Sequence, residues 1–244
     1  MHGWTLAIVA GAAPSLFLLT FFYLRDRWQR EPMQHVLLAF GLGTYAMAAA
    51  RGLAFTVLGF LPPDWLASGT EAARLFESLV LAGYIEESAK AIVLFTAIYH
   101  WDEFDEPLDG VVYGVAVALG FATLENVFYI AQAQNQLGYD RGFTIVWQRA
   151  LFSVPAHALF GGTMGYYAGK SKFDRSKPAV LWRDRVFSVL VPILFHGAYN
   201  YALHHRLDGK IWATVTLISV GMWVFVLRRV QHADNASPFR PKSG

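Results

Sequence analysis

Long runs of apolar residues, separated by short polar connectors, make up most of this 244-residue chain. The first run covers residues 4–24 and contains no charged side chain. Six more follow at about 35–60, 74–99, 109–131, 145–168, 186–204 and 210–227. A helix of roughly 18 or more apolar residues is long enough to cross the hydrocarbon core of a bilayer. We therefore expect an all-α, polytopic transmembrane bundle of about seven spans.

Composition agrees with a membrane protein. Hydrophobic residues make up 55% of the chain and charged residues only 16%, against roughly 25% charged residues in soluble domains. The chain has no cysteine, which excludes disulfides, thiolate metal sites and a cysteine nucleophile. The net charge of +2 gives no indication of a nucleic-acid partner, so the lipid bilayer is the partner that the composition predicts.

The distribution of basic residues predicts the orientation of the bundle. Most of the 20 Lys and Arg residues fall in segments 25–30, 170–185 and 228–242, which lie on one side if seven spans are present. Cytoplasmic loops carry this excess, so we expect the N-terminus outside and the C-terminus in the cytoplasm. Basic residues directly after the first run favour a retained span over a signal peptide. We expect one transmembrane domain over residues 1–230 and a disordered polar tail over 231–244.

Three charges interrupt the third run, in the stretch "YIEESAK". A charged residue at the centre of a spanning helix costs about 2.5–3.5 kcal/mol on insertion scales, and such residues are functional by default. On a helix, Lys90 is an i,i+4 neighbour of Glu86 and an i,i+3 neighbour of Glu87. The lysine can neutralise one carboxylate, and the other must find a partner on another helix or in water.

Later runs supply further polar residues at similar depth. The fourth run carries Glu125 and Asn126, the fifth His157, and the sixth the i,i+4 pair His196 and Asn200. We expect these side chains and the glutamate pair to meet around one hydrated cavity inside the membrane. Taken singly they have plainer interpretations, because histidines and asparagines often hold helices together by hydrogen bonds. Arg149 either reaches the membrane surface or pairs with a buried acid.

Buried carboxylates beside histidines suit acid–base chemistry on water, and imidazole or amide groups can stabilise an oxyanion. The set therefore favours hydrolysis of an amide bond. Zinc catalysis by His157, His196 and a glutamate is an alternative, although the helical H-E-x-x-H motif is absent. A proton- or ion-coupled transporter is another, because proton relays also use buried acids and histidines. A third interpretation is an inactive protein that binds a partner helix.

The motifs resemble the PrsW family of intramembrane proteases. "EESAK" is similar to its EExxK motif, and "FATLEN", with Phe121, Glu125 and Asn126, to its FxxxEN motif. "RALFSVPAHALFGGTMGYY" resembles the segment with its next histidine, and "HGAYN" its closing motif. The motifs follow the family's order between about residues 77 and 203.

The resemblance implies a glutamic-type peptidase, related to CAAX- and bacteriocin-processing membrane proteases, in a prokaryotic cytoplasmic membrane. Its catalytic residues would be Glu86, Glu87, Glu125, His157 and His196, with Lys90, Phe121, Asn126, Arg149 and Asn200 in support. It implies a membrane-anchored protein substrate, as for a family member that cleaves an anti-sigma factor and starts a stress response. We expect no cofactor, although the family's earlier grouping with metallopeptidases leaves zinc open.

Overall fold

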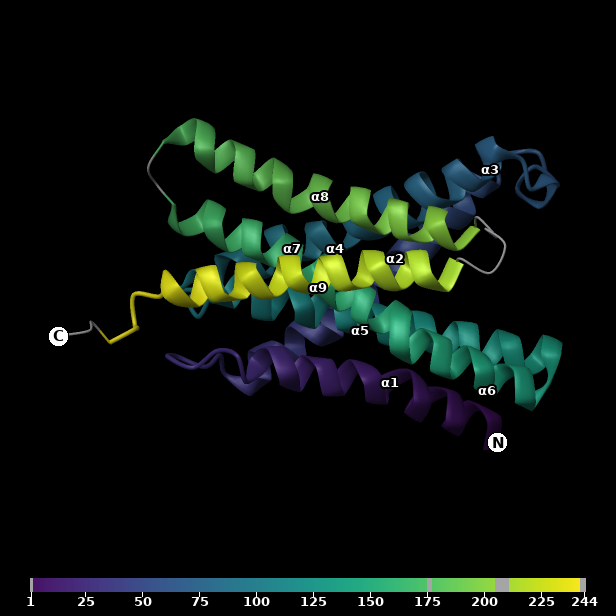
Figure 1. The fold of residues 1–244 in the computed structure, drawn as a ribbon, viewed down its shortest axis with the longest axis horizontal. Helices are drawn as coiled ribbons and strands as arrows, with labels where there is room; N and C mark the ends of the chain where they lie inside the picture. Colours follow the sequence, from purple (N-terminus) through teal and green to yellow (C-terminus); the bar gives the residue numbers. More distant parts are fainter. Residues whose placement is uncertain (1, 175–176, 205–210, 242–244) are drawn as a thin grey trace.

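The computed structural model describes residues 2–174, 177–204 and 211–241, and these residues form helices joined by short connectors without a strand. The expected all-α membrane bundle is confirmed. The helices run roughly along one direction, and α1 begins at the end of the bundle opposite to the one where α9 finishes (Figure 1). The elements are α1 (His2–Tyr23), α2 (Met33–Leu58), η1 (Leu66–Ser68), α3 (Glu71–Leu75), η2 (Phe76–Glu86), α4 (Glu87–Thr96), η3 (Ile98–His100), α5 (Pro107–Leu137), α6 (Tyr139–Gln148), η4 (Arg149–Ser153), α7 (Val154–Phe173), α8 (Pro178–His204) and α9 (Ile211–Asn235).

Each predicted span corresponds to helical structure. Among the described residues, four helices are long and apolar enough to cross a membrane, namely Met33–Leu58, Pro107–Gln136, Pro178–His204 and Ala213–Asn235. Ile8–Tyr23 is a shorter apolar helix. The third and fifth predicted spans each consist of three helical elements that follow one another without a break, α3–η2–α4 and α6–η4–α7. Both spans contain a π-helix, η2 and η4, which a regular helical repeat does not predict.

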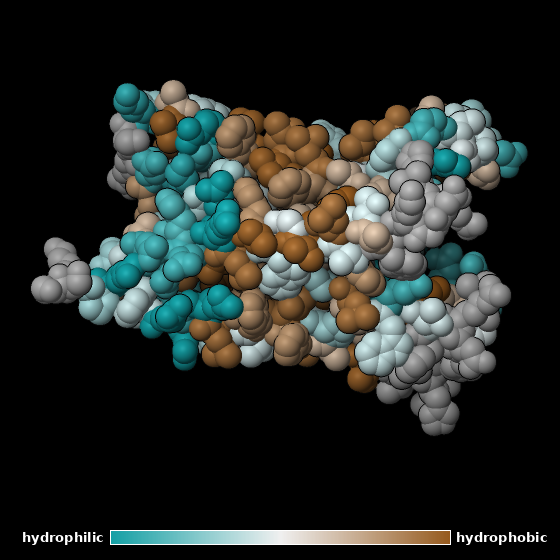
Figure 2. Space-filling view, in the orientation of Figure 1, coloured by the Kyte–Doolittle hydropathy of each residue, from teal (hydrophilic) through white to brown (hydrophobic). Residues whose placement is uncertain are grey.

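The surface carries an apolar belt. Figure 2 shows brown, hydrophobic side chains across the middle of the molecule and teal, hydrophilic ones at both ends. Large apolar side chains such as Phe17, Phe55, Ile92 and Leu217 are more than half exposed in the protein alone. Contiguous exposed apolar surface of this kind marks contact with lipid or another protein. The belt therefore agrees with the expected bilayer partner.

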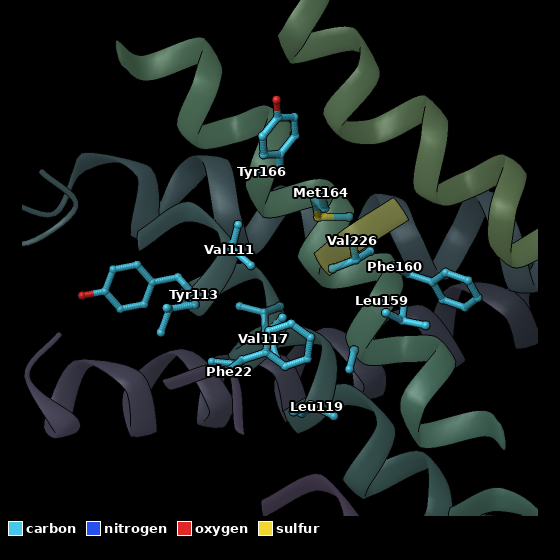
Figure 3. Packing of buried hydrophobic residues seen from close by; sticks show 14 of the residues in the cluster. Phe22, Val111, Tyr113, Val117, Leu119, Leu159, Phe160, Met164, Tyr166 and Val226 are labelled. Atoms are coloured by element: carbon cyan, nitrogen blue, oxygen red, sulfur yellow. The ribbon is translucent and has the colours of Figure 1, made fainter. Parts of the chain in front are cut away.

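Helices α5 and α7 form the centre of the bundle. Their buried side chains include Val111, Val117, Leu159 and Met164, which pack together with Phe22 of α1 and Val226 of α9 (Figure 3). Glycines bring the two backbones into contact: a Cβ on Gly165 would lie 1.8 Å from the carbonyl oxygen of Gly110. Small residues allow this close approach where lipid gives helices little hydrophobic reason to associate. The close pairing fixes α5 and α7, which carry two of the predicted site segments.

Helix boundaries follow local signals at several points. Pro107 occupies the first turn of α5, where its missing N–H costs nothing, and Gly138 ends that helix with φ 83°. At the other end of the chain, α9 continues to Asn235, and Ala233 and Ser237 are buried. Helix α9 thus continues into the first residues of the segment 231–244, which the sequence analysis expects to be a disordered tail. Residues 242–244 lie outside the described residues.

Candidate active site

Six helical elements bring the predicted site residues together, among them η4, which begins at Arg149. Glu86 is the last residue of the π-helix η2, while Glu87 begins α4, which also carries Lys90. Glu125 and Asn126 lie on α5, His157 on α7, and His196 and Asn200 on α8. π-Helical segments occur frequently at functional sites, and both π-helices here end or begin at a charged residue of this cluster.

Glu87 and Lys90 form a buried ion pair. The Lys90 Nζ atom donates to Glu87 Oε1 over 2.6 Å, and the side chains are 1% and 0% exposed. The same carboxylate oxygen lies 2.7 Å from His196 Nδ1. Glu87 is therefore held from two sides, and it fixes the ring of His196 from α8.

A second chain of contacts runs from Lys90 through His157 to Glu125. The Lys90 ammonium lies 3.0 Å from His157 Nδ1, and His157 Nε2 lies 3.1 Å from Glu125 Oε2. An ammonium only donates, so Nδ1 is the acceptor, and Nε2 carries the ring proton and donates it to the carboxylate. Both nitrogens of His157 are thus engaged.

Arg149 closes this chain from the π-helix η4. Its Nη2 atom lies 2.5 Å from Glu125 Oε2, and its Nε atom donates to Asn126 Oδ1. The guanidinium also stacks over Tyr129, 4.1 Å from the ring centroid. Of the two interpretations that the sequence left open, the structure places Arg149 in a pair with a buried acid.

Two phenylalanines enclose the polar groups. Lys90 Nζ lies 4.2 Å from the ring centroid of Phe121, a cation–π geometry. His196 stacks on Phe160 with ring centroids 4.6 Å apart. The role of Phe160 was not foreseen, because a phenylalanine in an apolar run gives no signal of a site; only its i,i+3 spacing from His157 could have suggested one.

Glu86 differs from its neighbour because it lines a cavity. It lines a cavity of about 550 Å³ between α2, η2, α5 and α8, together with Glu125, Arg149 and Asn200. A second cavity of about 190 Å³ shares Glu125, Arg149 and Asn200 and also touches His157 and His196. Glu86 Oε2 has no hydrogen-bond partner among the described residues and lies 4.0 Å from His196 Nε2. Arg51 of α2 also lines the larger cavity.

The cluster offers some of the ligand atoms that a zinc site requires. One atom each of Glu86, His157 and His196 lies within 4.8 Å of the others, and three protein ligands are typical of catalytic zinc. The hydrogen bonds of His157 oppose this assignment. Nε2 carries a proton and Nδ1 accepts from Lys90, so the ring offers no free lone pair. Glu86 and His196 alone fall short of three ligands, and the donor set does not fit zinc.

Comparisons with known proteins identify relatives along most of the chain. The model of the PrsW family intramembrane metalloprotease matches residues 31–228. Protease PrsW of Bacillus subtilis (strain 168) is 37% identical over 230 residues, 94% of this chain and 96% of the relative. Protease PrsW of Geobacillus kaustophilus (strain HTA426) is 36% identical over 93% of this chain and 91% of its own length. No solved structure matches the chain.

Proposed function

Since this chain belongs to the PrsW family of intramembrane proteases, we propose that it cleaves a membrane-tethered protein with water activated by Glu86. Protease activity in a prokaryotic membrane follows from the family and its bacterial relatives. The match favours this function over the transporter and the inactive scaffold. The single observation that carries the glutamate mechanism is the contrast between Glu86, free at a cavity, and Glu87, held by Lys90 and His196.

Glu86 is the general base in this mechanism. Its Oε2 atom and His196 Nε2 are 4.0 Å apart, a separation that one water molecule can bridge with two hydrogen bonds of about 2.8 Å. Because the Nδ1–H of His196 donates to Glu87, its Nε2 is an acceptor. Such a water donates one hydrogen to each group and leaves a lone pair for the carbonyl carbon of the substrate.

The reaction then follows the usual course of amide hydrolysis. Glu86 takes a proton from the water as the oxygen attacks, and the carbonyl oxygen becomes negatively charged. Asn200 Nδ2 lies 3.4 Å from His196 Nε2 and lines both cavities. The water takes the place of Asn200 as the donor to Nε2, and the released amide donates a hydrogen bond to the oxyanion. Glu86 finally gives its proton to the leaving amine, so one residue serves as base and then acid.

The remaining residues position these groups. Lys90 neutralises Glu87, which fixes the tautomer and the orientation of His196. His157, Glu125 and Arg149 brace Lys90 from the other side, and Phe121 and Asn126 support the same chain. His157 therefore positions the ammonium of Lys90.

The proposed chemistry needs no metal or other cofactor, because the donor set does not fit zinc and a carboxylate base is already present. The test is cleavage by purified protein in liposomes after treatment with 1,10-phenanthroline in a buffer that contains Mg²⁺, with zinc content measured in the same samples. Unchanged turnover at sub-stoichiometric zinc is expected. Loss of turnover that returns with added zinc would contradict the glutamate mechanism.

The position of the cavity supports a membrane-anchored substrate. The cavity is bounded by α2, η2 and α8, which form part of the membrane-embedded bundle, so a membrane-anchored protein reaches it more readily than a soluble one. We propose the cytoplasmic membrane as the location and an anti-sigma-factor-like protein as a candidate substrate. No nucleic acid takes part.

Membrane proteomics tests this function. The comparison uses strains that carry the wild-type protein, Glu86→Gln or the control Glu103→Gln. Glu103 suits a control because it lies in the polar connector before α5 and, among the described residues, forms an ion pair with His35 at 3.5 Å. One or more membrane-tethered proteins should accumulate uncleaved in the Glu86→Gln strain alone. Identical membrane proteomes in all three strains, at equal protein levels, would refute the proposal.

A further inference from the structure

A second group of buried acids lies away from the active site, where α1 ends and α5 begins. We call Asp26, Glu106 and Asp109 the acidic site. Asp26 follows α1, Glu106 directly precedes α5, and Asp109 lies in the first turn of α5. Asp109 and Glu125 are roughly 24 Å apart along α5 at 1.5 Å per residue, so the acidic site is separate from the catalytic groups.

The three acids converge on one point. One carboxylate oxygen from each lies within 4.8 Å of the others, and all three residues are fully buried. Other oxygens already have partners: Asp109 Oδ2 accepts from the backbone N–H groups of Asp105 and Glu106, and Asp26 Oδ2 accepts from that of Glu31. These bonds fix the carboxylates and leave one side of each unused.

The unused oxygens point to a ligand. Asp26 Oδ1 is buried and has no hydrogen-bond partner among the described residues, and Asp109 faces another carboxyl, that of Glu31, instead of a cation. Glu106 accepts from the backbone N–H of Asp109 in a capping box and lies beside the Ser237 hydroxyl. A buried carboxylate without a partner carries a large desolvation cost, and buried charges normally pair or coordinate a metal.

Among the described residues, neither Lys nor Arg forms an ion pair with the three acids, and only the nearby charges of Arg30 and Lys172 offset part of the negative charge. The nearby basic groups are committed elsewhere: Arg30 Nε donates to the carbonyl oxygen of Asp26, and Lys172 Nζ donates to the carbonyl oxygens of Tyr99 and Trp101.

Two more acids increase the negative charge around the site. Glu31 is buried and accepts a hydrogen bond from Tyr113, and Asp234 of α9 is also buried. The acidic site and its surroundings therefore carry an excess of negative charge that a bound cation would balance.

We propose that Asp26, Glu106 and Asp109 bind a hard divalent cation of the Mg²⁺, Mn²⁺ and Ca²⁺ class. Carboxylate oxygens are the ligands these ions prefer, whereas zinc and copper favour nitrogen and sulfur. The ion ties the end of α1 to the start of α5. Because α5 carries Glu125 and pairs closely with α7, the ion holds the central helix in place without entering the chemistry.

Direct binding is the first measurement. Purified full-length protein is stripped with EDTA and titrated with Mn²⁺, and free Mn²⁺ is followed by electron paramagnetic resonance. About one Mn²⁺ per chain should bind, displaced by excess Mg²⁺ or Ca²⁺, and Mn²⁺ should raise the melting temperature of the wild-type protein. No saturable binding, or binding without any effect on melting, would overturn the proposal.

Variants locate the ion. Asp26→Asn and Glu106→Gln should weaken Mn²⁺ binding at least tenfold, whereas Asp102→Asn, an exposed acid in the same connector, should leave it unchanged. Glu86→Gln should also bind Mn²⁺ normally, since the proposed base lies elsewhere. Equal binding by Glu106→Gln and wild type, or loss of binding in Glu86→Gln alone, would show that the ion does not use the acidic site.

Discussion

Replacing Lys90 by Met tests the electrostatic centre of the site. Methionine keeps an unbranched apolar chain of similar length but removes the ammonium that lies 2.6 Å from Glu87 and 3.0 Å from His157. The Glu87 carboxylate then stays buried, with only His196 as a partner. The variant should therefore lose stability as well as activity.

The magnitude follows from the burial of the pair. Both side chains are at most 1% exposed, and removing one partner of a buried ion pair costs about 3–5 kcal/mol. The lost cation–π contact with Phe121 adds roughly 1 kcal/mol or less if it behaves like an exposed one. We expect Lys90→Met to lower the free energy of unfolding by about 3–5 kcal/mol.

Unfolding in mixed micelles, driven by rising SDS, measures this change. Arg74→Met is the matched control, because Arg74 and Glu71 form an i,i+3 pair at 4.0 Å that is 39% and 51% exposed; such pairs contribute about 0–1 kcal/mol. The double variant Lys90→Met/Glu87→Gln removes both charges and should recover at least half of the loss. If Lys90→Met costs no more than Arg74→Met, the pair does not carry the energy assigned to it.

Two further changes test the packing of α5 against α7 and the contacts of Arg149 with Glu125 and Asn126. Gly165→Ala should destabilise the protein by about 1–3 kcal/mol or more in the same unfolding assay, since its Cβ would lie 1.8 Å from Gly110 O. The control Gly221→Ala should not, because its Cβ would meet nothing within 4 Å. Equal stability of the two variants would contradict the close α5–α7 contact. Arg149→Gln should lower kcat about 10- to 100-fold while KM changes little, because Arg149 positions Glu125 and Asn126, and Arg149→Lys should recover only part of this, since an ammonium cannot reproduce the planar fork. Full activity of Arg149→Gln in a liposome cleavage assay would remove Arg149 from the site.

The helical architecture was predictable because apolar length alone decides it. Each run of the sequence became a helical course, and short connectors left the order unambiguous. The π-helices were not predictable, since η2 and η4 contain no residue pattern that distinguishes them from an α-helix. The orientation across the membrane stays a prediction from basic residues, as does the division into one domain.

The sequence predicted which residues converge at the site but not which of them pair with one another. Charges and histidines at similar depth indicated convergence, and helical spacing allowed Lys90 to neutralise either glutamate. Only the three-dimensional structure assigns Lys90 to Glu87 and leaves Glu86 at the cavity. The acidic site was invisible, because Asp26 and Glu106 are far apart in the sequence and lie in polar connectors, where acidic residues are common.

The different roles of Glu86 and Glu87 are tested most directly by single-turnover cleavage of a membrane-tethered substrate in liposomes. Glu86→Gln should slow the chemical step at least about 1,000-fold, or roughly 4 kcal/mol of barrier, with substrate affinity unchanged. Glu87→Gln keeps a hydrogen-bonding oxygen near Lys90 and His196 and should slow the step less. A Glu86→Gln enzyme that cleaves within a few fold of the wild-type rate would show that this residue is not the base.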